Sequence, residues 1–176
     1  STNSGGDTLL YPIYTTAANA TTSFSLTNTS SSETVLAKVR FREQKRSMDV
    51  LDFYAVLSPN DKFDFWVERP NGDERPSMGW ADNTDRVQFP APIPFVDSSA
   101  DMQLGHLEIL GVADLTGMYV NSQGQATSSG ADGAISLAGA ALHDSNGVPA
   151  NCNILVTTFA SPSNVATIDP SSSGSP

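Results

Sequence analysis

Few side chains of this chain could act as a nucleophile or a base, because 176 residues include only two histidines and one cysteine. A cysteine nucleophile needs an imidazole within hydrogen-bond reach, so His143 and Cys152 are the candidate pair. Cys152, however, lies just before the apolar run that begins at Ile154, where a buried and inert thiol is the common outcome. The sequence has no Gly-rich phosphate loop, serine nucleophile elbow or CxxC motif. We therefore predict that the protein is not an enzyme and has no catalytic residues.

Side chains that ligate metals occur in two places. His106 and Glu108 are two residues apart, so they would share one face of a strand, but a zinc site uses three or four ligands. A second group of oxygen-bearing side chains suits calcium, although it lacks the glycine and terminal glutamate of an EF-hand loop. We favour a solvated acidic loop, expect no required cofactor, and regard Ca²⁺ as the cation to test first. This group comprises Asp82, Asn83, Asp85, Asp97 and Asp101.

Four aromatic side chains are candidates for a platform on which a sugar ring stacks, namely Trp66, Trp80, Tyr54 and Tyr11. Trp66 should point outward from a strand or pack under the following segment, and packing is favoured because large aromatics are usually covered. That segment, 68–100, contains five prolines and no strand pattern, and long loops of this kind are often functional. The alternative function is therefore an extracellular carbohydrate- or ligand-binding module that uses this loop, with a cell-surface glycan as partner.

The framework that would position these side chains consists of short strands. In the central stretch, residues 35–67, apolar and polar residues alternate with the period of half-buried strands. The alternation predicts that Val39, Phe41, Phe63 and Phe65 face inward and that the basic residues between 38 and 42 take the other face. A proline and an asparagine within 58–61 favour a tight turn, so 53–57 and 62–67 are expected to form a hairpin. The segment 43–52 is either a helical turn capped by Ser47 or a loop.

Towards the amino end, the apolar run 9–14 contains Pro12, which cannot donate a ladder hydrogen bond. The run therefore predicts a strand that lies at a sheet edge or carries a bulge. Such an edge could pair with another molecule, although an ordinary first strand of its own sheet is the favoured interpretation. Alternation at 21–29 predicts a second strand. Asn19 and Asn28 each begin a glycosylation acceptor triplet, a pattern that arises by chance in a chain rich in Ser and Thr.

The second half of the chain has less regular patterns. Residues 104–112 predict a strand that is buried on both faces, and 121–133 a mobile, low-complexity segment. Residues 134–142 favour a short helix, and 154–159 a final strand. The last residues, 161–176, are rich in Ser and Pro and are typical of a linker or tail.

The composition also favours a fold of short strands, since 39% of the residues are hydrophobic and only 16% are charged. A polar, uncharged and turn-rich chain favours many short strands over long helices, and this length suits a single core. We predict an all-β, Ig-like antiparallel β-sandwich domain in residues 1–160, followed by a tail or linker in 161–176. The sandwich should carry a long Pro-rich loop and at most one or two short helices.

The net charge of −10 argues against nucleic acid and anionic membranes as partners. The sequence has no apolar run long enough for a transmembrane helix. Five of the nine basic residues fall within nine positions, and no Lys or Arg follows Arg86, so the chain is electrically polarised along its length. The five clustered residues are Lys38, Arg40, Arg42, Lys45 and Arg46.

The polar start, low lysine content, and abundance of Ser and Thr favour an exported protein whose signal peptide has been removed. A further indication comes from six segments, namely 7–12, 24–30, 39–43, 49–53, 57–61 and 143–152. These segments resemble a group of uncharacterised exported bacterial surface proteins. The resemblance implies an extracellular or cell-surface location and carries no catalytic residues.

Together these features predict a non-enzymatic structural subunit of an extracellular assembly, either a surface layer or a filament. Copies of the chain would form a homopolymer through strand pairing at the amino end and head-to-tail contacts between opposite charges. The expected interface residues are Leu9, Leu10, Tyr11, Ile13, Lys38, Arg40, Arg42, Lys45 and Arg46.

Overall fold

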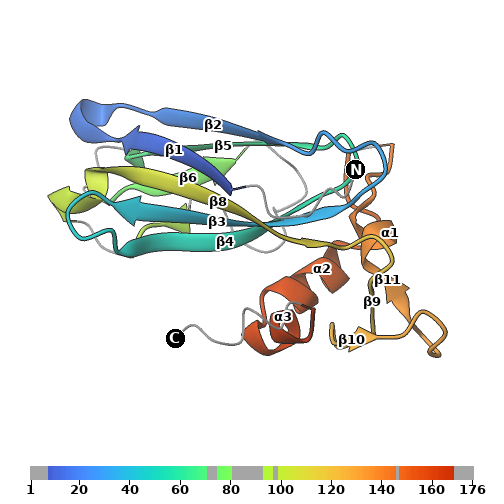
Figure 1. Cartoon of the computed structure of the whole chain (residues 1–176). Coiled ribbons are helices and arrows are strands. Elements are labelled where there is room, and N and C mark those ends of the chain that lie inside the picture. The colour runs from blue at the N-terminus through green and yellow to red at the C-terminus, as the bar shows by residue number, and fades with distance from the viewer. Residues whose placement is uncertain (1–7, 71–74, 81–92, 97–98, 146, 169–176) are drawn as a thin grey trace.

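The computed structural model describes residues 8–70, 75–80, 93–96, 99–145 and 147–168. Two four-stranded antiparallel sheets pack against each other, and a smaller lobe with its own three-stranded sheet lies at one end of them (Figure 1). The predicted all-β sandwich is therefore confirmed. The described residues form three short α-helices, one more than the sequence suggested.

The first sheet has the strand order β1-β8-β3-β4. β3 lies inside this sheet, and its buried residues alternate with outward basic ones, as predicted. β1 lies at the edge, and its register shifts between Tyr11 and Tyr14, around Pro12. Both the edge position and the irregularity expected from Pro12 are confirmed. The strands are β1 (Thr8–Thr15), β3 (Val35–Glu43), β4 (Asp49–Leu57) and β8 (Leu104–Asp114).

The second sheet has the strand order β2-β5-β6-β7. Its last two strands lie within 68–100, where the sequence predicted no strand, so that prediction is wrong for part of the segment. β6 escaped detection because it is short and buried at every position, which leaves no alternation to recognise. The strands are β2 (Thr22–Thr27), β5 (Lys62–Glu68), β6 (Ser77–Trp80) and β7 (Ile93–Pro94).

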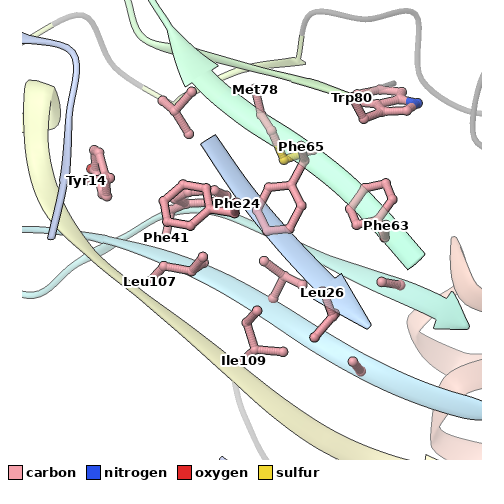
Figure 2. Close-up of a cluster of buried hydrophobic side chains, with 14 of the residues drawn as sticks. Tyr14, Phe24, Leu26, Phe41, Phe63, Phe65, Met78, Trp80, Leu107 and Ile109 are labelled. Carbon is pink, nitrogen blue, oxygen red and sulfur yellow. The ribbon is translucent and has the colours of Figure 1, made fainter. Parts of the chain in front are cut away.

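The main core fills the space between the two sheets and is rich in aromatic rings (Figure 2). Phe41 of the first sheet meets Phe65 of the second edge to face, with 6.2 Å between ring centroids. Phe24 stacks on Phe65 at 5.2 Å, and Tyr14 meets Phe41 edge to face at 5.6 Å. Edge-to-face and offset contacts of this kind stabilise a core beyond simple burial. The sandwich therefore depends on inward residues that the alternation had identified.

The tight turn at 58–61 is confirmed, since the amide of Asp61 donates to the carbonyl of Ser58 at 3.1 Å and Asn60 has a φ of 59°. The predicted hairpin of 53–57 with 62–67 is wrong, because β4 pairs with β3 while β5 pairs with β2 and β6. The turn carries the chain from one sheet to the other. Both runs have an apolar face, and these faces meet across the core rather than in one sheet.

The actual hairpin joins β3 to β4 through the segment for which a helical turn or a loop was expected. Residues 44–48 of this segment form the loop, whereas residues 49–52 already belong to β4, where the sequence predicted no strand. In the loop, Ser47 has a φ of 55°, and its amide donates to the carbonyl of Glu43 at 3.1 Å. In Figure 1 this loop lies at the end of the sandwich opposite the lobe.

The lobe follows β8 and packs against the outer face of the first sheet at one end. Leu36 is fully buried there and shares a second hydrophobic core with Leu115, Val120 and Leu137 of the lobe. The lobe consists of β9 (Tyr119–Val120), β10 (Ala126–Thr127), β11 (Ile135–Ser136), α1 (Leu137–Ala141), α2 (Cys152–Phe159) and α3 (Pro162–Ile168). The short helix predicted within 134–142 is confirmed as α1, and the low-complexity segment 121–133 contains β10.

The final strand predicted at 154–159 is wrong, because these residues belong to helix α2. The side chain of Asn151 caps this helix by accepting a hydrogen bond from the amide of Ile154 at 3.2 Å. The predicted tail is also wrong for residues 162–168, which form α3 and bury Val165 and Ile168. Pro162 occupies the first helical position, where it costs no hydrogen bond. Residues 169–176 lie outside the described part of the chain.

Candidate functional site

The outer edge of β1 is the most exposed apolar element among the described strands. β1 pairs with β8 on one side, and no described strand pairs with its other side. Leu10 is 62% exposed and Ile13 58% exposed, and the adjacent Leu9 is less exposed at 42%. An edge that combines free backbone groups with apolar side chains is a template for pairing with another chain.

β1 itself is held firmly in its own sheet, as the sequence favoured. Tyr14 is fully buried, and its hydroxyl donates to the carbonyl of Met102 at 3.1 Å. The hydroxyl of Thr22 closes the turn to β2: it accepts from the amide of Thr15 at 3.0 Å and donates to the carbonyl of Thr15 at 2.8 Å. Tyr11 meets Phe24 edge to face at 5.4 Å. The inward residues of β1 thus anchor the strand, which leaves the outward residues available.

The basic residues predicted for the interface are largely engaged within the molecule. Lys38 pairs with Asp52 at 2.8 Å and lies over the ring of Tyr54 at 5.0 Å. Arg42 pairs with Glu108 at 2.9 Å and with Asp49 at 3.4 Å. These pairs lie side by side on the outer face of the first sheet, so they reduce the positive charge that it offers to a partner.

Arg40 stands between acidic neighbours, since its register partners are Asp52 on β4 and Glu108 on β8. At the tip of the β3–β4 loop the arrangement is different. Lys45 and Arg46 are exposed, and Lys45 makes only a solvated ion pair with Asp101 at 3.3 Å. The structure therefore separates the five basic residues into two groups. Lys38, Arg40 and Arg42 lie on the sheet among acidic side chains, and Lys45 and Arg46 are exposed at the loop.

Glu43 holds this loop together from inside. Its side chain is buried, and its carboxylate accepts hydrogen bonds from the amides of Lys45, Arg46 and Met48. Burial raises the pKa of this carboxyl, but the three amides and the charge of Arg46 lower it by more, so the pKa lies below its ordinary value. Burial, together with the charge of Glu43, raises the pKa of Tyr14, which therefore stays a neutral donor.

A polar cluster that the sequence did not reveal joins the lobe to the turn between the two sheets. Nδ1 of His143 lies 3.2 Å from the hydroxyl of Ser58 and 3.8 Å from a carboxylate oxygen of Asp61. A serine–histidine–aspartate triad uses both ring nitrogens, one for each partner, whereas here the same nitrogen faces both groups. The thiol of Cys152 instead donates to the carbonyl of Pro149 at 3.6 Å. The cluster therefore connects the lobe to the sandwich.

A second polar centre lies beside it, at Asn28. This side chain is buried and donates to the carbonyls of Glu33, Leu57 and Ser58 at 2.7, 3.2 and 2.9 Å. A glycan on this nitrogen would leave it a single N–H for these three carbonyls and would place a sugar at a buried position, so glycosylation of Asn28 is incompatible with the fold. Asn19, in the other triplet, is exposed.

The candidate calcium ligands are only partly within the described residues. Asp82, Asp85 and Asp97 lie outside them, and Asp101 pairs with Lys45. Across the ranges that the structure describes, no group of three or more His, Cys, Asp and Glu side chains could hold a metal ion. Of the other candidate metal ligands, Nε2 of His106 lies 3.7 Å from a carboxylate oxygen of Glu108.

The structure does not bring the two tryptophans together. Trp80 is buried in the main core (Figure 2), and its register partner is the inward-facing Phe65. Trp66 points to the opposite, outer face of the second sheet. Tyr54 packs near Phe159 of the lobe, with 6.3 Å between the ring centroids. The four-membered aromatic platform is therefore not formed, and Trp66 remains as its one outward tryptophan.

No match was found when the sequence was compared with protein-family models and with curated proteins, or when the structure was compared with solved structures. The resemblance to exported surface proteins therefore stays a prediction. Among the described residues, no helix is both long and apolar enough to span a membrane.

Proposed function

We propose that this protein is a non-enzymatic structural subunit of an extracellular assembly, a surface layer or a filament, in which copies of the chain join through β1. The observation that carries the proposal is the outer edge of β1, which pairs with no other strand of the described residues and exposes Leu10 and Ile13. Soluble proteins usually protect such edges with charges, prolines or covering loops. Pro12 protects one part of β1, and residues 8–11 keep a regular register with β8.

A second copy of the same strand is the partner that fits this edge. Two β1 strands related by a twofold axis would place apolar side chains against apolar side chains and extend the first sheet across both subunits. The contact is isologous, so by itself it closes as a pair. Further growth requires a different contact elsewhere on the molecule.

Charge supplies that second, head-to-tail contact. The exposed Lys45 and Arg46 lie at the loop between β3 and β4, at one end of the sandwich, and the lobe lies at the other end (Figure 1). The lobe contains no lysine or arginine, since the last basic residue of the chain is Arg86. Contacts between these unlike ends would join one pair to the next and produce an open array.

Sedimentation velocity and negative-stain microscopy of Leu10→Lys test the strand contact. The side chain of a leucine contributes about 1.5–3 kcal/mol when it is fully buried, so the dissociation constant of the pair should rise about tenfold or more. Val96→Lys is the matched control, because Val96 is 68% exposed and lies outside β1. A wild-type protein that stays monomeric at high concentration, or a Leu10→Lys variant that assembles normally, would refute the strand contact.

The double variant Lys45→Gln and Arg46→Gln tests the charge contact in the same assays. Pairs should persist, whereas long arrays should be lost, and the wild-type arrays should shorten as salt is added because exposed charges are screened. The control is Lys38→Gln, because Lys38 is already paired with Asp52. Arrays that survive the double variant would contradict the head-to-tail contact and leave the pairing through β1 intact.

A further inference from the structure

Trp66 occupies an unusual position on the outer face of the second sheet. A β-carbon placed on Gly79, its register partner on β6, would lie only 2.6 Å from Cε2 of the indole. The ring therefore rests directly on the backbone of β6, and only a glycine permits this contact. Gly79 is buried by the ring, while Trp66 itself is partly exposed.

The ring is also held in orientation by a polar contact. Its Nε1 group donates to the carboxylate of Glu68 at 3.1 Å. On β2, the register partner of Trp66 is Ser23, which is exposed and too short to cover an indole. The described neighbours thus fix the ring on the sheet without enclosing it from the side of β2.

Polar groups that exchange hydrogen bonds with hydroxyls lie on the same face of the sheet as this ring, along β2 and β5. Asp64 points to the same face two residues earlier on β5 and pairs with Lys62 at 2.9 Å. Hydrogen bonds from Lys62 and from Ser25 hold the pKa of Asp64 below its ordinary value, so this side chain is a carboxylate acceptor. Along β2, Ser23, Ser25 and Thr27 are all exposed.

We propose that this face is a carbohydrate-binding site, with one pyranose ring stacked on Trp66 and its hydroxyls bonded to Asp64 and the serine row of β2. A rigid aromatic surface flanked by a few placed polar groups is the usual composition of a site for such a ligand. The expected class is a neutral, equatorially linked glucose or N-acetylglucosamine chain, because such a sugar presents a flat C–H face. An acidic sugar is disfavoured, since Lys62 is the only cation among these groups and is already paired with Asp64.

The site is independent of assembly through β1, because it lies on the other sheet. It also differs from the loop site expected from the sequence, which relied on Trp80. A single stacked ring gives weak binding, and copies held in an array would strengthen it through avidity. Binding is therefore measured on the Leu10→Lys background as well as on the wild-type chain.

The test is a titration of the full chain with cellohexaose and with chitohexaose, followed by tryptophan fluorescence and by the NMR shift of the Trp66 indole N–H. At least one of the two sugars should bind, and Trp66→Ala should weaken that binding about tenfold or more. Ser23→Arg should weaken it comparably, because an exposed arginine in register with Trp66 would cover the ring. This second variant keeps Trp66 on Gly79, so it remains informative if Trp66→Ala fails to fold.

Thr29→Arg is the matched control for Ser23→Arg, since Thr29 is also exposed and lies beyond the end of β2. The Thr29→Arg variant should bind the sugar with the same affinity as the wild type. The proposal is overturned if neither sugar binds at concentrations up to about 10 mM, or if Ser23→Arg binds as well as Thr29→Arg. Loss of binding in Leu10→Lys alone would show that binding depends on assembly, which would contradict a site contained within one chain.

Discussion

Asn28 offers the sharpest test of how the end of the sandwich is held beneath the lobe. Its side-chain nitrogen donates to three carbonyls, those of Glu33, Leu57 and Ser58, and its oxygen accepts from the amide of Ser30 at 3.1 Å. One buried side chain therefore ties the loop before β3 to the turn between β4 and β5. Removing it leaves several backbone groups without this partner in a region that is largely closed to water.

Replacement of Asn28 by alanine should destabilise the protein by about 2–4 kcal/mol. Each buried group that loses its partner costs about 1–3 kcal/mol, and local relaxation with entry of water should recover part of the total. For a chain of this size, the loss corresponds to a fall in Tm of roughly 5–12 °C. Chemical and thermal unfolding followed by circular dichroism would measure both quantities.

Two further variants make the reasoning refutable. Asn28→Asp should lose more stability than Asn28→Ala at pH 7, because a carboxylate would face three carbonyl oxygens. The gap between the two variants should narrow in acid, where the protonated carboxyl can donate a hydrogen bond again. Asn153→Ala is the control, because Asn153 is an exposed asparagine on helix α2, and it should change the stability by less than about 0.5 kcal/mol. A value for Asn28→Ala that matches this control would show that the buried hydrogen bonds do not hold the turn.

Two other predictions concern the sheet that carries β1. Glu43→Gln should be less stable than the wild type at neutral pH, and the difference in unfolding free energy should shrink below about pH 4.5. A carboxylate with a lowered pKa stabilises the fold above its ordinary pKa and loses this contribution as it is protonated. Urea unfolding at several pH values measures the difference, and a difference that does not depend on pH would contradict the role of the charge. Gly105→Ala should destabilise the fold by more than about 3 kcal/mol, because the new β-carbon would lie 2.0 Å from the carbonyl oxygen of Arg42. Gly130→Ala is the control and should be close to neutral, because its β-carbon would meet no atom within 4 Å. Equal thermal stability of the two alanine variants would refute the steric argument.

Much of the sandwich could be predicted from local pattern. Alternation identified Val39, Phe41, Phe63 and Phe65 as inward residues, and all four are buried. Pro12 indicated an edge strand, which the structure confirms. These predictions succeed because a half-buried strand repeats its environment at every second residue, so each residue carries the signal independently of its distant partners.

The candidate sites were less accessible to this reasoning. Ser58, Asp61 and His143 meet although the histidine is 85 residues from the serine, and no local pattern predicts such a contact. The two tryptophans belong to neighbouring strands, but their register places Trp80 inward beside Phe65 and Trp66 outward over Gly79. Only the pairing of β5 with β6 decides that they cannot share one ligand.

Composition, charge order and hydrophobic period are local properties, so they were sufficient to predict an all-β chain with an acidic, polarised charge and an edge strand near its amino end. Tertiary structure decided which sheet each strand joins, that 152–159 and 162–168 are helices of a packed lobe, and that Lys38 and Arg42 are paired while Lys45 and Arg46 remain exposed. These outcomes depend on contacts between residues far apart in the chain, whose free energies are comparable with the local preferences that they override.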